Sequence, residues 1–325
     1  MEVVAGIDGG GTKTLVALCT PEGRVLGLGR GGPSNVDDVG IATATQSIGA
    51  ALDAACTEAK VGLEVLSSTF FGMAGVVSEE DRAIVQGIAQ NLGLSGQSGI
   101  DHDCRIALAG ALSGRPGIVL IAGTGSSCFG RNQQGEVWRS GGWGYLVSDE
   151  GSSYWLGREA LVRVVRAVDG RDPPTALQPR LLEVLRVNHT DRLLHRLYVE
   201  GLSRSELAAL APQVIAAADE GDTAASQLLN QGGRLLVECV AAVAQQLELS
   251  DSELAVVGGL TKAGAAFWQP FKTALSEQLP QIRLTEAELP PVLGAVVCAL
   301  EAQQKLNTTN LHALKNAAVE HAERL

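Results

Sequence analysis

Two short glycine-rich turns hold the residues with the clearest chemical use. The first spans Asp8 to Thr12 and follows a short apolar run, Val3 to Ile7. The second spans Gly123 to Ser126 and follows a similar run, Ile118 to Ile121. Because glycine has no Cβ, such a turn can bring several backbone N–H groups close to a phosphate. If both turns face one cleft, they would hold a polyphosphate from two sides.

The first turn differs from the two common nucleotide motifs that precede a helix. Counted from Gly9, the dinucleotide pattern G-x-G-x-x-G lacks its third glycine, because Thr14 stands there. The Walker A pattern G-x-x-x-x-G-K-[ST] is one residue out, since an extra residue separates Gly11 from Lys13. Both motifs also need a helix next, whereas residues 14–20 have the composition of a strand. One such turn is ambiguous with a tight hairpin entrance, but two equivalent turns favour phosphate binding.

Charged side chains beside the first turn suit a phosphate site that uses a metal. Asp8 ends the apolar run, and its carboxylate would repel phosphate unless a divalent cation lay between them. The sequence therefore predicts Asp8 as a Mg²⁺ ligand, directly or through water, with turn stabilisation as the alternative. Lys13 either neutralises phosphate charge or points to solvent.

The pattern around the first turn occurs twice along the chain. The residues "IDGGGT … PEGRV" correspond to "IAGTGS … QQGEV" in the second half, and each set indicates a hairpin. Further on, "FFGMAG" corresponds to "VVGGLTKAG", and the helical "DCRIALAGAL" corresponds to "PVLGAVVCAL". Three correspondences in the same order indicate an internal duplication.

These elements predict an α/β fold with two similar halves. In each half a hairpin precedes strand–helix units, which gives a mixed sheet with helices on its faces. Residues 1–114 are expected to form the first domain and residues 115–325 the second. A helical stretch at about 160–249 has no counterpart in the first half and is predicted to be an insertion. The tail, 307–325, reads as a closing helix.

Composition excludes several classes of protein. The chain has 325 residues, of which 46% are hydrophobic and 19% charged, so two packed domains are expected rather than disorder. The net charge of −11 argues against nucleic acid and anionic membrane as partners, since both need a positive surface. The N-terminus lacks the basic region of a signal peptide, and no apolar stretch reaches the length of a membrane span. A cytoplasmic location is therefore expected. The six cysteines lack CxxC spacing and are predicted to be buried thiols.

The chain resembles the BadF/BadG/BcrA/BcrD-type ATPase family, and within it the N-acetylglucosamine and glucosamine kinases. The resemblance runs from Gly6 to about Leu300 and rests on "GIDGGGTKT", "GPSN", "DCRIALAGAL", "GIVLIAGTGS", "GGWGYLVSDEGSSYWLG" and "VVGGLTKAG". The motif from Gly141 to Gly157 is the most specific of these. The family belongs to the actin/hexokinase/heat-shock-70 superfamily, so the resemblance implies two duplicated ribonuclease-H-like (actin-like ATPase) domains. It also implies ATP and Mg²⁺ as cofactors, a small-molecule sugar as substrate and, in many members, a homodimer.

The resemblance also implies roles for individual residues. Asp8 looks like the metal-binding aspartate, and Asp103 looks like the catalytic base. The residues implied to bind ATP are Gly9, Gly10, Gly11, Thr12, Lys13, Gly123, Thr124, Gly125, Ser126, Gly258 and Gly259, the last two near adenosine. The residues implied to contact the sugar are Asn35, Asp103, Thr124, Gly142 and Asp149, with Trp143 in the wall of the pocket.

The chemistry of the residues supports these roles and leaves alternatives. Transfer of a phosphoryl group to a sugar hydroxyl needs a base, and Asp103 stands where a strand passes into a helix. A helix N-cap is its alternative role, and Asp101 is the competing base. Asn35 follows a rigid loop and either grips hydroxyls or forms an Asx-turn. Asp149 either accepts bonds from the sugar or caps a helix, and for Glu150 the sequence favours neither.

The first functional expectation is an ATP-dependent kinase that phosphorylates the 6-hydroxyl of N-acetylglucosamine. Glucosamine and glucose stay open as acceptors. A second class is the ATPase activator of a radical dehydratase, which bridges an iron–sulfur cluster through cysteines. Cys104 and Cys128 are isolated, which argues against that class. A third class is an ATP-gated binding module, which would bind nucleotide without turnover.

Overall fold

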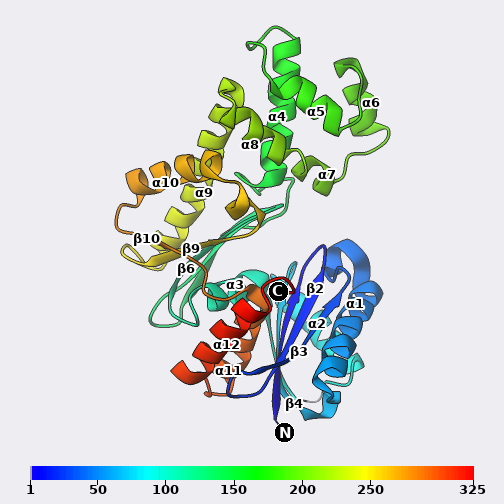
Figure 1. Ribbon diagram of the computed structural model, residues 1–325, viewed down its shortest axis with the longest axis vertical. Coiled ribbons are helices and arrows are strands. Elements are labelled where there is room, and N and C mark those ends of the chain that lie inside the picture. Colours follow the sequence, from blue (N-terminus) through cyan, green and yellow to red (C-terminus); the bar gives the residue numbers. More distant parts are fainter. Residues whose placement is uncertain (1, 95) are drawn as a thin grey trace. The chain divides into compact units, whose positions relative to one another are not determined.

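The computed structural model describes residues 2–94 and 96–325 and divides them into two compact units (Figure 1). The first unit runs to Pro116 and resumes from Glu286 to Leu325, and the second is Gly117–Thr285. Within the described residues, none of the helices has the length and apolar character needed to cross a membrane.

A five-stranded mixed sheet forms the centre of the first unit. Its strands are β1 (Val3–Gly9), β2 (Thr14–Cys19), β3 (Val25–Gly31), β4 (Leu66–Met73) and β5 (Gln97–His102). Their order is β3-β2-β1-β4-β5, with β1 antiparallel to β2 and parallel to β4. Both β1 and β2 are buried on both faces, which explains why their sequences are continuous apolar runs rather than alternating ones.

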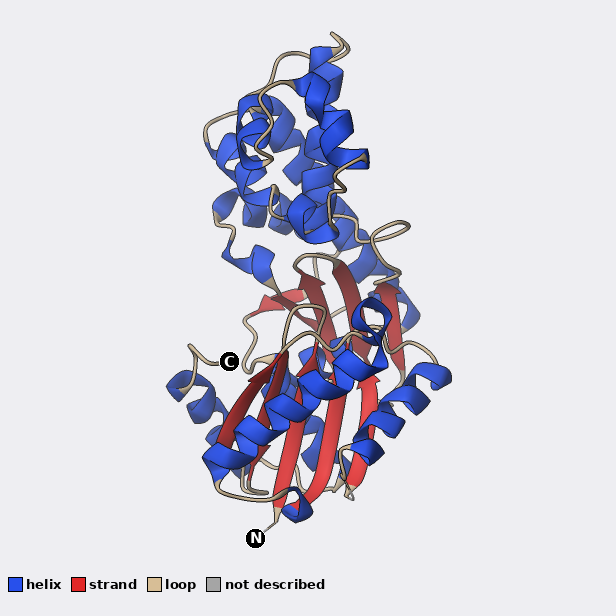
Figure 2. Cartoon of the chain, turned by 90° about the vertical axis from the view of Figure 1, so that its right-hand side faces the viewer, coloured by secondary structure: helices blue, strands red, loops and turns tan. Residues whose placement is uncertain are grey.

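Helices cover both faces of this sheet (Figure 2). They are α1 (Val36–Ala59), α2 (Glu79–Asn91), α3 (Asp103–Ala111), α11 (Pro291–Ala302) and α12 (Thr308–Glu320), with a 3-10 turn η1 (Leu63–Val65). Side chains of β1 alternate between two cores: Val3 and Ile7 pack with α1, whereas Val4 packs with α11. The helix α11 thus closes the second face of the sheet.

Close backbone contacts place the C-terminal segment in the first unit. A Cβ on Gly6 of β1 would lie 2.5 Å from the Val292 carbonyl oxygen of α11. A Cβ on Gly294 of α11 would lie 2.0 Å from the Ile106 carbonyl oxygen of α3. Because these backbones touch, Glu286–Leu325 is part of the first unit. The domain division predicted from the sequence differs here, since it assigned this segment to the second domain.

The second unit repeats the sheet of the first. Its strands are β6 (Gly117–Ala122), β7 (Ser126–Arg131), β8 (Val137–Gly141), β9 (Glu253–Val257) and β10 (Arg283–Thr285). Their order is β10-β9-β6-β7-β8, with β6 antiparallel to β7 and parallel to β9. Each sheet therefore has a three-stranded antiparallel meander followed by parallel strands, as the predicted duplication requires.

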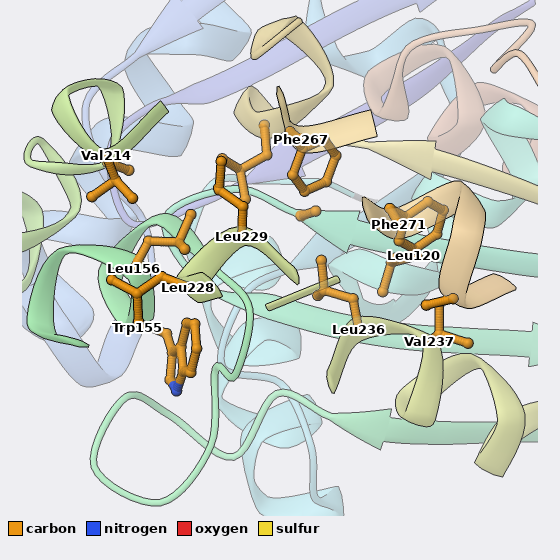
Figure 3. Close-up of a cluster of buried hydrophobic side chains, with 14 of the residues drawn as sticks. Leu120, Trp155, Leu156, Val214, Leu228, Leu229, Leu236, Val237, Phe267 and Phe271 are labelled. Carbon is orange, nitrogen blue, oxygen red and sulfur yellow. The ribbon is translucent and has the colours of Figure 1, made fainter. Parts of the chain in front are cut away.

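Helices form most of the rest of the second unit. They are α4 (Ser153–Val168), α5 (Leu177–Val184), α6 (Leu193–Tyr198), α7 (Arg204–Ala208), α8 (Ala211–Asp219), α9 (Thr223–Gln246) and α10 (Ala265–Gln278), with 3-10 turns η2 (Thr190–Arg192) and η3 (Gly259–Lys262). Figure 3 shows side chains of α4, α8, α9 and α10 in one apolar core together with Leu120 of β6. The stretch from α4 to α9 is helical as expected, and its origin as an insertion stays a prediction.

Candidate functional site

The first glycine turn joins β1 to β2 in the first unit. The Gly10 N–H donates to the Lys13 carbonyl at 3.0 Å, which closes the turn. Gly11 and Thr12 at its tip are exposed. An exposed tip on a buried strand pair is the arrangement that an anion-binding turn needs.

The segment after β3 supports this turn from one side. The Ser34 N–H donates to the Gly10 carbonyl at 2.9 Å, and the Thr14 hydroxyl donates to Ser34 Oγ at 2.8 Å. A Cβ on Gly9 would lie 2.6 Å from Ser34 Oγ, so glycine is the residue that fits there. Sequence reasoning gave Ser34 and Thr14 no part in the site, although the "GPSN" motif already contained the signal.

Asp8 lies near the end of β1 and is partly buried. Burial first, and then the charge of Asp103, raise the pKa of the Asp8 carboxyl to about 7, against the lowering effect of Lys13. A bound cation would offset both the desolvation and the repulsion between the two carboxylates. The surroundings of Asp8 therefore fit Mg²⁺, and its role as a ligand stays a proposal.

The two aspartates at the β5–α3 junction have different surroundings. Asp101 Oδ1 accepts a hydrogen bond from Arg82 Nη2 at 3.0 Å, so this carboxylate is held in an ion pair. Asp103 is the first residue of α3, and the N-cap position belongs to the residue before it. Its carboxylate accepts from the Cys104 thiol at 3.5 Å and acts electrostatically on Asp8. This contrast favours Asp103 over Asp101 as the base.

Asn35 is the N-cap of α1. Its Oδ1 accepts from the Asp37 N–H at 3.2 Å, and its Nδ2 donates to Asp38 Oδ2 at 2.9 Å. Asn35 also lines a small pocket together with Met73 and Val76. The Asx-turn that the sequence left open is therefore present, and a sugar contact by the same amide stays a prediction.

The second glycine turn joins β6 to β7 in the second unit. The Ser126 N–H donates to Asp149 Oδ1 at 3.1 Å, and the Ser126 hydroxyl donates to the Glu150 carbonyl at 2.8 Å. The N–H groups of Ser153 and Tyr154 donate to carbonyl oxygens of the turn at 2.9 and 3.2 Å. Four hydrogen bonds thus join this turn to the segment that leads into α4.

Asp149 is buried, with 2% of its surface exposed, and its φ is +66°. Its Oδ2 accepts from Arg204 Nη2 at 2.6 Å, and Ser152, not Asp149, is the N-cap of α4. The capping alternative for Asp149 is therefore wrong, and its contact with sugar stays a prediction. Arg204 is a residue that sequence reasoning missed. It lies 55 positions further along the chain, and no local pattern connects the two.

A third glycine turn follows β9 in the same unit. Gly258 has a φ of +107°, and a Cβ there would lie 2.5 Å from the Ala122 carbonyl oxygen at the end of β6. A Cβ on Gly123 would lie 3.7 Å from the Gly259 nitrogen. Because β6 and β9 are parallel neighbours, the structure brings the second turn and the predicted adenosine turn side by side. Contact with adenosine itself stays a prediction.

Gly142 and Trp143 lie in the loop after β8. Gly142 has a φ of +73°, and a Cβ there would lie 2.8 Å from Ser127 Oγ. Trp143 is 70% exposed, with the Arg139 guanidinium 5.0 Å from its ring centroid. The ring is thus accessible to a ligand, and its place in a sugar pocket stays a prediction.

The cysteines bear on the iron–sulfur alternative. Cys104 and Cys128 are both buried, and the described residues contain no disulfide. In the part of the chain that the structure describes, the one group of three metal-type side chains is His102, Asp103 and Cys104, which are consecutive in sequence. Buried thiols of this kind do not present the exposed cysteine ligands that a cluster shared between subunits would need.

Solved structures share this fold. A Chromobacterium violaceum protein provisionally named N-acetylglucosamine kinase superposes with a TM-score of 0.75 and 25% identity, over 92% of this chain and 99% of that one. A ROK-family glucokinase from Streptomyces griseus superposes with a TM-score of 0.58 and 18% identity, over 93% and 99% of the two chains. The two helix-flanked mixed sheets are therefore those of the actin-like ATPase fold, as predicted.

Sequence comparison gives the family. The N-acetylmuramic acid/N-acetylglucosamine kinase of Clostridium acetobutylicum is 32% identical over 92% of this chain and 98% of its own length. The N-acetyl-D-glucosamine kinase of Dictyostelium discoideum is 29% identical over 93% and 99% of the two chains. The sequence profile of the BadF/BadG/BcrA/BcrD ATPase family matches residues 5–299. With nearly the whole chain matched, this protein belongs to the BadF/BadG/BcrA/BcrD ATPase family.

Proposed function

We propose that this protein is an ATP-dependent kinase that phosphorylates an amino sugar, with N-acetylglucosamine as its first acceptor. The observation that carries the proposal is the pair of glycine turns at equivalent positions of two equally ordered sheets, one of them beside Asp8 and Asp103. The names of the two curated relatives support the acceptor class. A cytoplasmic location and a homodimer, both predicted from the sequence, are part of the same proposal.

The chain's own residues would divide the work as follows. The turns Gly9–Lys13 and Gly123–Ser126 would bind phosphate oxygens through backbone N–H groups and hydroxyls. Gly258 and Gly259 would lie against the adenosine. Asp8 would hold Mg²⁺, which neutralises phosphate charge when it is bound. The side chains and backbone proposed to hold the sugar are those of Asn35, Asp103, Thr124, Gly142, Trp143 and Asp149.

Asp103 is the proposed base for the transfer. Its carboxylate would accept the proton of the sugar 6-hydroxyl as that oxygen forms a bond to the γ-phosphorus. The bond between the γ-phosphorus and its bridging oxygen breaks, and ADP leaves with the electron pair. Asp101 is a poorer candidate, because Arg82 already occupies its carboxylate.

Other acceptors and other functions make different predictions. Glucosamine and glucose differ from N-acetylglucosamine only at the 2-substituent, so the same machinery would serve them. An activator of a radical dehydratase would hydrolyse ATP without any sugar and would contain iron. A binding module would take up nucleotide without releasing ADP.

A coupled assay of ADP release separates these functions. The acceptors are N-acetylglucosamine, glucosamine, glucose, N-acetylmannosamine and N-acetylmuramic acid, each compared with a reaction without sugar. We expect release to depend on sugar and to be fastest with N-acetylglucosamine. The 6-deoxy analogue should bind without turnover, because it lacks the accepting hydroxyl. Equal ADP release with and without sugar would refute the kinase.

A further inference from the structure

We propose that Arg204 is a positioning residue that holds the second phosphate turn in place through Asp149. Arg204 begins α7, one of the helices between β8 and β9, and lies outside every motif that the resemblance uses. The inference rests on the proposed function, because it concerns the turn assigned to ATP phosphates.

A continuous chain of contacts links Arg204 to the turn. Arg204 Nη2 donates to Asp149 Oδ2 at 2.6 Å, and Asp149 Oδ1 accepts from the Ser126 N–H at 3.1 Å. The two oxygens of one carboxylate thus join α7 to the first residue of β7. Since each oxygen has a different partner, displacement of Arg204 would move the Asp149 carboxylate, which also binds the Ser126 N–H.

The pair lies directly against the turn. A Cβ on Gly125 would be 2.3 Å from Arg204 Nη2 and 2.7 Å from Asp149 Oδ1. Any larger residue at position 125 would therefore displace the ion pair. This close approach explains the second glycine of the turn, which has no positive φ of its own to require it.

Asp149 depends on its partner. The carboxylate is almost completely buried, and a buried charge that loses its partner is strongly destabilising. Its φ of +66° is also unfavourable for a residue with a Cβ, so surrounding contacts must stabilise that conformation. The Arg204 guanidinium supplies the charge that compensates this burial.

Arg204 also contacts the loop predicted to form the sugar pocket. Its guanidinium lies 5.9 Å from the Tyr145 ring centroid, and the Tyr145 ring packs edge-on against Tyr154 at 5.3 Å. Tyr145 is two residues from Trp143, and Tyr154 donates a backbone hydrogen bond to the turn. One side chain therefore lies against both the phosphate turn and the proposed sugar loop.

The expected consequence is a loss of alignment rather than of a substrate contact. Without Arg204 the turn would shift relative to the phosphates. A misplacement of about 1 Å costs about 10- to 100-fold in rate. We expect Arg204→Gln to lower kcat/KM for ATP by about 10- to 100-fold, mainly through a lower kcat. Arg204→Lys keeps the charge and should recover part of the loss.

The test is a double-mutant cycle with an independent structural measurement. The variants are Arg204→Gln, Arg204→Lys, Asp149→Asn and the double variant Arg204→Gln/Asp149→Asn, each assayed for ATP and for sugar. If Arg204 acts through Asp149, its substitution should have little further effect in the Asp149→Asn background. Hydrogen exchange of peptides covering residues 123–128 should be faster in Arg204→Gln than in the parent.

A matched control and two outcomes decide the result. Arg180→Gln removes an arginine of the same unit that pairs with the exposed Glu220, and it should leave both measurements unchanged. The proposal would be overturned if Arg204→Gln lowered activity equally in the parent and in the Asp149→Asn background. Unchanged hydrogen exchange in the turn would also overturn it. If the parent showed no sugar-dependent ADP release, the proposed kinase function would be refuted. The role of Arg204 would still be tested, because hydrogen exchange in the turn does not depend on turnover. If Arg204→Gln does not fold, Arg204→Lys is compared with the parent and with Arg204→Lys/Asp149→Asn, and the same pattern is expected with a smaller loss.

Discussion

Four aspartates stand beside the glycine turns, and their surroundings separate their roles. Asp101 pairs with Arg82, and Asp149 pairs with Arg204. For Asp8 the lowering effect of Lys13 is outweighed: burial and the charge of Asp103 raise its pKa to about 7. A paired carboxylate has its charge compensated within the fold, whereas a partly desolvated one with a like-charged neighbour is typical of a catalytic site.

Substitution of Asp8 should change how stability depends on pH. Because its pKa is raised above the unfolded value of 3.8 to about 7, the folded protein without Mg²⁺ loses stability as pH rises through that interval. Asp8→Asn removes this loss. We expect the variant to match the parent near pH 4 and to exceed it above pH 7, by on the order of 4 kcal/mol. Chemical unfolding at a series of pH values measures the difference.

The control for this prediction is Asp53→Asn, which removes an exposed carboxylate of α1. Its effect on stability should be small beside that of Asp8→Asn above pH 7, because the side chain is exposed. An Asp8→Asn effect that is equally large at pH 4 and pH 8 would show that burial does not penalise the Asp8 charge.

Substitution of the proposed base should remove turnover but not binding. Asp103→Asn keeps the shape of the side chain and loses the proton acceptor, so kcat should fall by about 10²- to 10⁴-fold. Nucleotide affinity, followed by thermal shift with Mg·ATP, should stay close to that of the parent. Asp101→Asn is the matched comparison and should retain most of the turnover. The opposite ranking of the two variants would exchange their roles.

At the scale of elements, backbone contacts set how the layers approach each other. The β1–α11–α3 contact depends on Gly6 and Gly294, where the backbones leave no room for a Cβ. The turn after β9 depends on Gly258 in the same way. These contacts join segments far apart in the sequence, so no local sequence pattern predicts them.

Replacement of the α11 glycine should be costly. In Gly294→Ala the new Cβ would meet the Ile106 carbonyl oxygen at 2.0 Å, so α11 and α3 must separate. We expect a loss of about 2 kcal/mol or more in the free energy of unfolding. Gly87→Ala in α2 is the control, because open space surrounds its Cβ and helix propensity should add about 0.5–1 kcal/mol. Equal effects of the two substitutions in urea unfolding would contradict the tight contact.

The strands and helices of this chain were largely predictable from local pattern. The hairpin after the first turn and the helix beginning after Asp101 were expected close to where they lie, because apolar runs and turn residues are local signals. The contrast between Asp101 and Asp103 was not predictable in this way. It depends on Arg82, which a helix brings from 19 positions away.

At the scale of the whole molecule, the first unit is made from both ends of the chain. Residues from Glu286 onward supply α11, which covers one face of the β1 sheet. The first unit therefore cannot fold completely without residues 286–325. This differs from a reading of the chain as two consecutive domains.

Removal of residues 286–325 should unfold the first unit. The truncation exposes the apolar face that α11 buries, including Val4 and Ala17. We expect peptides of residues 2–116 to become sensitive to protease while helices of the second unit stay protected. Limited proteolysis with mass spectrometry measures this. A truncated chain whose first unit resists protease as the full chain does would contradict the two-ended unit.

The sequence by itself determined the turns, the duplicated order of strands and the family. These follow from glycine, from apolar runs and from motifs, all of which act within a few residues of backbone. Only the tertiary structure decided which carboxylates are neutralised and that α11 belongs to the first unit. Arg204 shows the reason: its contact with Asp149 spans 55 residues, and only the folded chain brings the two side chains together. The glycine turn at Gly123–Ser126 was predictable from the sequence, but its contact with Asp149 and Arg204 was not.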